Sequence, residues 1–246
     1  MCGRFAITLT PDEYRAAFGY DERPNFPPRY NVAPTQPVPI VHRDRGASRF
    51  RLVRWGFLPA WLKDAKGFPL LINARADTLL EKPAFRGAMR YRRCVFLADG
   101  FYEWRREGRA RTPFLIKSAQ RKPLPFAGLW ETHHSPDGGE IDTAAIVTTD
   151  ANGTLAAIHH RMPAILSPAD VEGWLDTDGV GAEDAARLIQ PCPEAWLDMF
   201  EVSGRVNKTD NDDPGLQEPV VSSIAGSGAD PAFSVPQDAV EQGRLF

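Results

Sequence analysis

The sequence has little of what marks secreted, membrane or metal-binding proteins. It contains only three cysteines, Cys2, Cys94 and Cys192, and no two are close enough in sequence to form a metal-ligand pair. It has no run of about 18 apolar residues, and no basic stretch is followed by an apolar one near its start. We therefore expect a protein of the reducing cytoplasm with no membrane span, no bound metal and no cofactor.

Charge is unevenly shared between the two halves of the chain. Residues 1–122 carry 24 Lys and Arg against 11 Asp and Glu, a net charge of +13, whereas residues 123–246 carry 5 against 21, a net charge of −16. A basic half of this strength suggests an anionic partner, and nucleic acid is the commonest one. The alternative is that the two halves pair within one domain and neutralise each other.

The order of the expected elements indicates the fold class. The 246 residues, 43% apolar and 25% charged, allow one large domain or two. Strands are expected at 2–7, 49–57, 94–104, 112–118, 125–132, 141–149 and 161–167. Helices are expected at 11–18, 75–90 with a break at Pro83, 151–158, 168–175 and 182–190. Because strands and helices do not alternate regularly, we predict an α+β domain with a mostly antiparallel, barrel-like β core.

Local signals refine this outline at three places. Thr10 is a suitable N-cap for the first helix, and Ser167 is one for the helix at 168–175. The proline-rich residues 20–39 are typical of a loop. The domain is expected to cover residues 2–220, and the Ser, Gly, Ala and Asp-rich residues 221–246 are expected to form a disordered tail.

Cys2 follows the initiator methionine, which is usually removed when the next residue is small. A chain that begins with cysteine carries a free α-amine and a thiol on the same residue. The amine, with a reference pKa of about 7.7–8.0, condenses with an aldehyde to an imine, and the thiol then closes a five-membered thiazolidine ring. The alternative is that Cys2 is a small residue that merely permits processing.

Two further segments carry polar side chains that suit such chemistry. Asn73 and Arg75 offer an amide for a sugar hydroxyl or the cysteine amine and a guanidinium for a phosphate, or else they cap a helix. Glu103 shares a face of an alternating strand with Phe101. A carboxylate on an apolar face has a raised pKa and can shuttle protons, whereas one on an edge strand remains in solvent.

Two more segments have a functional and a structural interpretation. In the run from Ile158 to Pro163, a histidine can act as acid or base near neutral pH and Arg161 can clamp a phosphate. The same residues also suit a polar turn. The run from Arg54 to Trp61 combines arginine with aromatic rings, as a base-stacking platform does. It can equally be core, which we favour for Trp55.

Taken together, these segments resemble the SRAP family, the SOS-response-associated peptidases, whose members form DNA–protein crosslinks at abasic sites. The matching segments occur in the family's order and span nearly all of residues 2–219. They are Met1-Cys2-Gly3-Arg4-Phe5, Pro28-Arg29-Tyr30-Asn31-Val32-Ala33-Pro34-Thr35, Arg54-Trp55-Gly56, Asn73-Ala74-Arg75-Ala76-Asp77-Thr78, Gly100-Phe101-Tyr102-Glu103-Trp104, Ala127-Gly128-Leu129-Trp130-Glu131, Thr148-Thr149-Asp150-Ala151-Asn152, His159-His160-Arg161-Met162-Pro163 and Val202-Ser203-Gly204-Arg205-Val206-Asn207.

The resemblance implies a role for each matching position. The implied catalytic residues are Cys2, Asn73, Glu103 and His159. His159 matches the family's histidine two residues before Arg-Met-Pro, although its neighbour His160 is also a histidine. The implied DNA contacts are Arg4, Arg75, Arg161, Trp61 and Trp104. The implied fold is an antiparallel β core with flanking helices and a basic cleft.

The resemblance also implies an activity and a partner. The expected function is a covalent thiazolidine crosslink between Cys2 and an abasic site in single-stranded DNA, which shields the site during the DNA damage response. The family's name implies a hydrolase or peptidase, and an imine intermediate adds a weak lyase activity. Three alternatives remain: an N-terminal-nucleophile amidohydrolase, a thiol peptidase in the strict sense, and a DNA-binding module without chemistry.

The chain ends in Gln242-Gly243-Arg244-Leu245-Phe246, which resembles the short peptide by which many bacterial repair proteins bind the sliding clamp. In such a peptide two adjacent apolar anchors enter a pocket while the glutamine fixes the register. The sequence therefore predicts the bacterial sliding clamp as a second partner. The alternative is an uninvolved tail, since five-residue motifs often arise by chance.

Overall fold

Strands dominate the part of this computed structural model that is described, residues 2–220. The strands are β1 (Phe5–Ile7), β2 (Arg29–Val32), β3 (Pro37–Asp44), β4 (Ala47–Trp55), β5 (Asn73–Arg75), β6 (Arg93–Phe96), β7 (Gly100–Glu107), β8 (Ala110–Ser118), β9 (Phe126–His134), β10 (Glu140–Asp150), β11 (Arg161–Pro163) and β12 (Leu197–Glu201). The helices are α1 (Pro11–Phe18), α2 (Arg86–Tyr91), α3 (Gly153–Ala156), α4 (Pro168–Leu175) and α5 (Ala182–Arg187). Four single 3-10 turns are η1 (Ala76–Thr78), η2 (Glu194–Trp196), η3 (Gly204–Asn207) and η4 (Pro214–Gln217).

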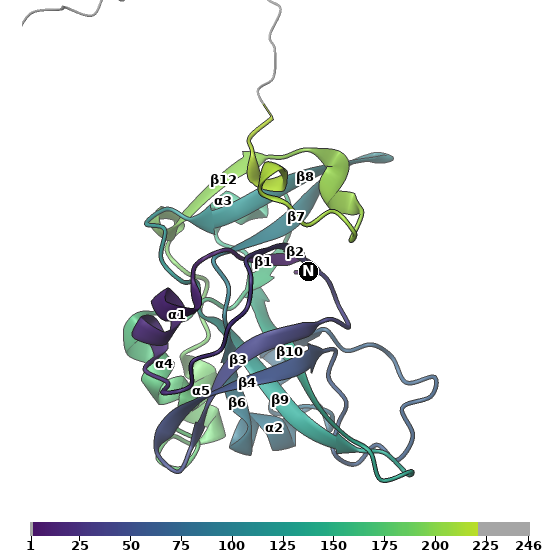
Figure 1. The fold of residues 1–246 in the computed structure, drawn as a ribbon, viewed down its shortest axis with the longest axis vertical. Helices are drawn as coiled ribbons and strands as arrows, with labels where there is room; N and C mark the ends of the chain where they lie inside the picture. Colours follow the sequence, from purple (N-terminus) through teal and green to yellow (C-terminus); the bar gives the residue numbers. More distant parts are fainter. Residues whose placement is uncertain (1, 221–246) are drawn as a thin grey trace, which may run out of the picture.

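The larger sheet closes into a barrel. Its strands pair in the order β10-β4-β3-β6-β9, and β9 pairs with β10 to complete the circle. Strands β5 and β11 add to β10 outside this circle. The pairings of β10 with β4 and β5 are parallel, and the other pairings are antiparallel. In Figure 1 helices α2, α4 and α5 lie along the barrel.

The second sheet is wholly antiparallel, with the strand order β12-β8-β7-β1-β2. It lies at one end of the barrel, and the short strand β1 is next to the place where the two sheets meet (Figure 1). Phe5 of β1 is completely buried and makes edge contacts with Trp55, Phe96 and Phe126 of the barrel, at ring-centroid distances of 5.0, 6.2 and 6.2 Å. The start of the chain is therefore anchored in the core.

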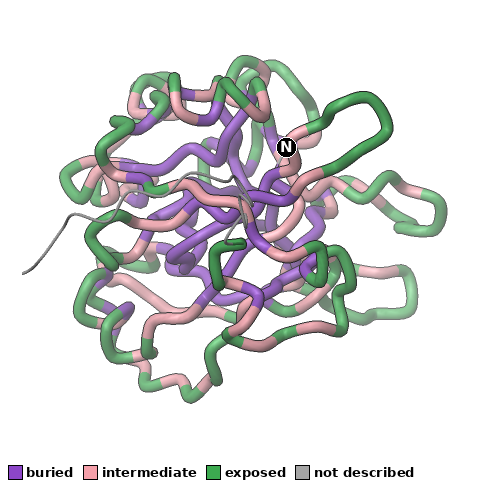
Figure 2. The backbone as a smooth tube through the Cα atoms, turned by 90° about the horizontal axis from the view of Figure 1, so that it is seen from above, coloured by how far each residue is buried: buried purple, intermediate pink, exposed green. Residues whose placement is uncertain are grey.

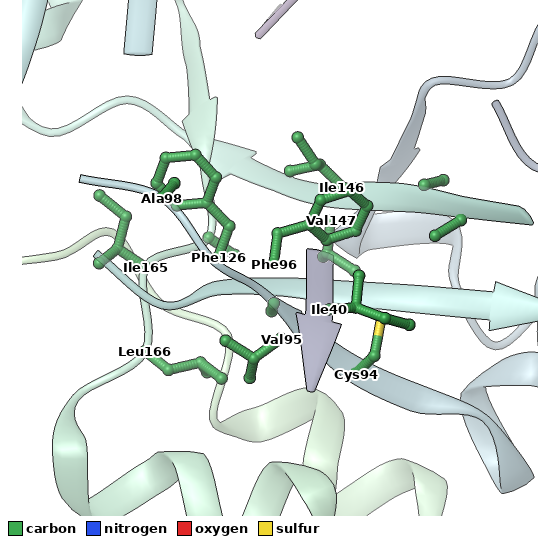
Figure 3. Packing of buried hydrophobic residues seen from close by; sticks show 14 of the residues in the cluster. Ile40, Cys94, Val95, Phe96, Ala98, Phe126, Ile146, Val147, Ile165 and Leu166 are labelled. Carbon is green, nitrogen blue, oxygen red and sulfur yellow. The ribbon is translucent and has the colours of Figure 1, made fainter. Parts of the chain in front are cut away.

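The hydrophobic core fills the barrel and continues beneath the second sheet. Figure 2 shows buried strands at the centre and exposed loops around them. Figure 3 shows Phe96 and Phe126 packed beside Ile40 and Ile146. Cys94 lies in the same cluster and is fully buried, and Trp55 is a core residue, as favoured from the sequence. The predicted α+β class with a mostly antiparallel, barrel-like core is also confirmed.

The two best helix signals are confirmed to the residue. Thr10 caps α1 with a complete capping box, in which its hydroxyl accepts from the backbone N–H of Glu13 and the Glu13 carboxylate accepts from the backbone N–H of Thr10. Gly19 ends α1 in the left-handed conformation, at a φ of 66°, where glycine avoids a steric penalty. Ser167 caps α4 through the backbone N–H of Asp170.

The helix predicted over 75–90 with a break at Pro83 is confirmed only after the break, by α2, and is wrong before it. Residues 73–75 instead form strand β5 beside Ile146, Val147 and Thr148 of β10, and only the turn η1 and the short helix α2 occupy the rest. Pairing with an already buried strand outweighs the helix propensity of this segment. Asn73 therefore lies on strand β5 and does not cap a helix.

The single strand predicted over 94–104 is also wrong, because the chain changes sheets within it. Strand β6 ends at Phe96 in the barrel, and β7 begins at Gly100 in the second sheet. Between them the Asp99 carboxylate accepts hydrogen bonds from the Thr8 backbone N–H (2.6 Å) and the Tyr14 hydroxyl (3.1 Å). These bonds satisfy a buried charge at the crossing point.

Three smaller expectations also need correction. The segment 20–39 is not all loop, because it contains β2 and the start of β3. The strand expected over 161–167 ends at Pro163. Its expected last residue, Ser167, is instead the N-cap of α4. Strand β12 was not expected at all. The predicted tail, 221–246, lies outside the described residues, and none of the described helices is long and apolar enough to cross a membrane.

Candidate functional site

The four residues singled out for catalysis come from four segments of the fold that belong to the two sheets. Cys2 precedes β1 and Glu103 lies on β7, the strand that pairs with β1. Asn73 lies on β5 and His159 lies just before β11, and both of these strands pair with β10 of the larger sheet. The site therefore forms where the two sheets meet.

Cys2 is buried, and its environment keeps the thiol protonated. Its Sγ lies 3.7 Å from the backbone oxygen of Arg4. Burial raises the pKa of the Cys2 thiol far above its usual value, and the negative charge of Glu103 raises it further. A neutral thiol is a poor first nucleophile, so this arrangement favours chemistry that begins elsewhere.

Asn73 connects the larger sheet to the start of the chain. Its Nδ2 donates a hydrogen bond to the backbone oxygen of Cys2, with a donor–acceptor distance of 3.0 Å. Among the described residues, no donor reaches its buried Oδ1. An unmatched buried acceptor beside Cys2 suits a donor that arrives later, such as an amine or a sugar hydroxyl.

Glu103 is buried on the face of β7 that it shares with Phe101, as the alternation of the strand predicted. Phe101 contacts Phe126 of the barrel at a ring-centroid distance of 5.8 Å, so this face is directed toward the core. The Glu103 side chain is only 3% exposed, and this burial raises the pKa of its carboxyl group. A carboxyl group with a raised pKa is protonated at a higher pH than an exposed glutamate, which suits it to proton transfer.

His159 is half-buried and held by the backbone. Its Nδ1 lies 3.0 Å from the backbone nitrogen of Arg161, and its ring stacks on that of His160 at 4.6 Å. Burial lowers the pKa of His159, so its imidazole is mostly neutral at neutral pH and can accept a proton. His160 is exposed on the outer side of this stacked pair.

Arg4 and Trp104, two of the predicted DNA contacts, are tied into the protein framework. The Nη1 of Arg4 donates to Oδ1 of Asn31 (2.7 Å) and to the backbone oxygen of Val206 (2.8 Å). The indole of Trp104 donates to Oδ1 of Asn207 at 2.8 Å. Their hydrogen bonds to Val206 and Asn207 mean that η3 fixes the positions of both side chains. Both side chains keep part of their surface exposed.

The other predicted DNA contacts differ in accessibility. Arg75 is exposed and makes a two-point ion pair with Asp77, at 2.7 and 3.1 Å. Arg161 is only 4% exposed and pairs with Asp150 at 3.2 Å, so little of its guanidinium is free to meet a ligand. Trp61 is 58% exposed on the loop between β4 and β5 and donates its indole N–H to Pro83. The roles of these residues in DNA binding stay predictions.

Arg106 is a residue that the sequence reasoning missed. Its positive charge opposes the rise that burial causes in the pKa of Glu103, and it adds to the fall that burial causes in the pKa of His159. Arg106 therefore lies close to both groups. A signal was present, because four arginines occur between residues 105 and 111 with a single acidic residue among them. Within residues 2–220, no cluster of His, Cys, Asp or Glu is arranged to hold a metal ion.

The fold and the site together define an α+β protein whose second residue, a buried cysteine, is held by the amide of Asn73 and affected by the charge of the Glu103 carboxylate. The family model described as "SOS response associated peptidase (SRAP)" matches residues 1–209, and the chain belongs to this family.

Individual relatives also match the chain over most of its length. The chain is 36% identical over 222 residues to the abasic site processing protein YoqW of Bacillus subtilis, covering 89% of this chain and 99% of that protein. It is 33% identical over 264 residues to the abasic site processing protein HMCES of Gallus gallus, covering 89% and 78%. A crystal structure of a protein from Bacteroides thetaiotaomicron has a TM-score of 0.81 at 26% identity, covering 89% of this chain and all of that one.

Proposed function

We propose that this protein processes abasic sites in single-stranded DNA by crosslinking itself to them through Cys2, after Met1 has been removed. The observation that carries the proposal is the set of groups around Cys2: the Asn73 hydrogen bond to its backbone, the buried Glu103 and the half-buried His159. The names of YoqW and HMCES as abasic site processing proteins support the same substrate.

The crosslink forms in two balanced steps. The open-chain form of an abasic sugar carries an aldehyde at C1′. The Cys2 amine adds to this carbon and water leaves, which gives a C1′–N imine. The thiol then adds across the C=N bond, so that sulfur bonds to C1′ and its proton goes to nitrogen. One aldehyde and one aminothiol thus become one thiazolidine and one water, with no redox change.

Each neighbour has a distinct part in these steps. Protonated Glu103 acts as the general acid for ring opening and for the departing water, a role that its raised pKa favours. Neutral His159 accepts protons during ring opening and returns them to the intermediates. Asn73 orients the amine through its free Oδ1 and keeps Cys2 in place through Nδ2.

The imine also permits β-elimination at the abasic sugar, so a weak strand-cleaving lyase activity accompanies crosslinking. Thiazolidine closure removes the C=N bond and traps the complex before cleavage. This order shields the abasic site, which fits a role in the DNA damage response. The same chemistry requires the free α-amine, so loss of Met1 is the one peptide-bond cleavage that the activity needs.

The main rival mechanism begins with the thiolate. In an N-terminal-nucleophile amidohydrolase or a thiol peptidase, the cysteine sulfur attacks an amide carbonyl and must be deprotonated first. Burial and the Glu103 charge raise the pKa of the Cys2 thiol, which works against that order. The amine-first route needs the thiol only in its second step, where a neighbouring base assists.

The proposal predicts a covalent product with a single-stranded oligonucleotide that contains one abasic site. Incubation followed by a denaturing gel should give a heat-stable band of slower mobility. Abasic sites within a duplex should react much more slowly, because stacked and paired flanking bases cannot enter a site built for one strand. Below saturation, the rate should fall as salt rises, since DNA binding by the basic half releases counterions.

Two control substrates make this test specific. A tetrahydrofuran analogue of the abasic site cannot open to an aldehyde, so it should bind and leave no covalent band. An oligonucleotide with an intact base at the same position should behave in the same way. Equal reaction with single-stranded and duplex abasic sites would contradict the single-strand proposal, and no band with either would refute the crosslinking activity itself.

We also infer that Gln242, Leu245 and Phe246, which lie outside the described residues, bind the bacterial sliding clamp. Such a link would bring the protein to stalled forks, where abasic single strands are exposed. Purified clamp should be retained by the immobilised full-length protein and lost from a version lacking residues 242–246. Equal retention by both proteins, or by neither, would remove the clamp as a partner and leave the abasic-site chemistry untouched.

A further inference from the structure

The hairpin of β7 and β8 places two arginines directly opposite each other. Arg106 pairs with Arg111 in the register of the two strands, and one further pair, Glu107 with Ala110, separates them from the turn at Gly108. Side chains at such positions have Cβ atoms about 4.5–5.5 Å apart, and like charges there destabilise a sheet. Glu107, the acidic residue next to Arg106 in the hairpin, pairs with Arg105 at 2.9 Å.

This pair lies beside the candidate site. The alternation of β7 puts Arg106 on the same face as Trp104, a predicted DNA contact. Strand β7 runs past the end of β1, which among the described residues pairs only with Gly100 and Phe101. Arg106 lies three residues beyond Glu103 on the same strand, although on the opposite face, and its charge acts on the pKa values of both Glu103 and His159.

The surroundings suit an anion and disfavour a cation. Arg106, Arg109 and Arg111 are all exposed, and they form the tip of the hairpin. In Figure 1 strand β7 of this hairpin lies beside β1, the strand that follows Cys2. A phosphate placed between Arg106 and Arg111 would accept hydrogen bonds from two guanidinium groups and relieve their mutual repulsion.

We propose that Arg106 and Arg111 form a phosphate-binding site that holds the sugar–phosphate backbone of a DNA strand next to Cys2. This proposal rests on the proposed function and adds to it a contact that fixes the position of the strand. The ligand is a phosphodiester, recognised through its charge and oxygens, so the site is independent of base sequence. Trp104 on the same face then provides a surface for a neighbouring base.

The test replaces both arginines and measures binding separately from chemistry. The variant Arg106→Gln/Arg111→Gln is compared with Arg86→Gln/Arg90→Gln on α2, which also loses two exposed charges but lies along the barrel, away from the start of the chain (Figure 1). Fluorescence anisotropy gives the Kd for a single-stranded oligonucleotide without an abasic site. The crosslinking rate at increasing concentrations of abasic oligonucleotide gives a maximal rate and a half-saturating concentration.

For the hairpin variant we expect the Kd and the half-saturating concentration to rise at least about ten-fold. The maximal rate should change much less, through the loss of the Arg106 charge that acts on Glu103 and His159. The slope of log Kd against log salt should fall by about 0.7 for each phosphate that the variant no longer binds. The α2 variant should stay near the wild type. The melting temperature of the hairpin variant should be equal to or above that of the wild type, because a like-charge pair is removed.

Three results would overturn the proposal. The first is an unchanged Kd in the hairpin variant, and the second is an equal loss of affinity in both variants, which would indicate a general charge effect. The third is a fall in the maximal rate at constant half-saturation, which would mean that Arg106 acts on Glu103 and His159 instead of on DNA. Because anisotropy uses intact DNA, it still tests this site if the wild type forms no crosslink.

Discussion

Replacement of Cys2 by alanine is expected to abolish the heat-stable crosslink completely. Alanine keeps the α-amine after removal of Met1, so it can form an imine with the abasic aldehyde, but it has no sulfur to close the ring. Cys2→Ser should likewise leave at most a reversible imine. The measurement is a time course of covalent product on a denaturing gel, with and without a borohydride reductant, which traps an imine and leaves a thiazolidine unaffected.

A second variant tests the position of the cysteine instead of its identity. One residue inserted between Met1 and Cys2 makes the cysteine internal, so its nitrogen is an amide that cannot form an imine. This variant should bind single-stranded DNA and form no crosslink. Because the side chain of Cys2 is retained, the core contacts of β1 remain as a control for folding. A heat-stable crosslink from Cys2→Ala or from the insertion variant would refute the thiazolidine mechanism.

Substitution of the proton-transfer groups should slow the reaction without unfolding the protein. Glu103→Gln and His159→Ala are each expected to reduce the maximal crosslinking rate by about 10²–10⁴-fold, the usual contribution of a general acid or base. His160→Ala is the matched control, because His160 is exposed and stacks on His159. A slow His160→Ala together with a normal His159→Ala would show that the catalytic histidine has been misassigned.

The pH dependence separates Glu103 from the cysteine amine. The amine reacts only when deprotonated, so the rate rises with pH through the amine pKa. Glu103 acts as an acid only when protonated, and burial raises its pKa, so its contribution persists to higher pH than for an exposed glutamate and is lost as pH rises further. The wild-type profile should therefore have two limbs, and Glu103→Gln should retain only the rising one. A falling limb that survives in Glu103→Gln would assign it to another group.

Local signals in the sequence predicted those parts of the fold that depend on neighbouring residues. In the caps of α1 and α4, the hydroxyl of Thr10 or Ser167 accepts from a backbone N–H only three residues further on, so the sequence alone predicts them. The alternation that puts Glu103 on the face of Phe101 is a property of any strand. The helix expected over 75–90 does not begin at Arg75, because this residue belongs to strand β5, which is stabilised by β10 about 70 residues away in sequence.

The same distinction between local and long-range information holds for the candidate site. The reactivity of an N-terminal cysteine, and the resemblance of nine ordered segments to one family, were available from the sequence. Whether Asn73, Glu103 and His159 surround Cys2 was decided by the meeting of two sheets, since β1 pairs with β7 while β5 and β11 pair with β10. Only the folded chain shows that Arg161 is almost entirely buried against Thr148 and Asp150, whereas Arg75 is exposed.

The sequence by itself thus determined which chemical groups this protein possesses and the spacing of its local structure. The tertiary structure alone decided which of those groups lie together, which are buried, and how their pKa values shift. The physical reason is that strand pairing between distant segments brings residues into contact, and desolvation in that contact changes their protonation. Arg106 illustrates this: in the sequence it is one of several arginines in a hairpin, and in the fold its charge acts on both Glu103 and His159.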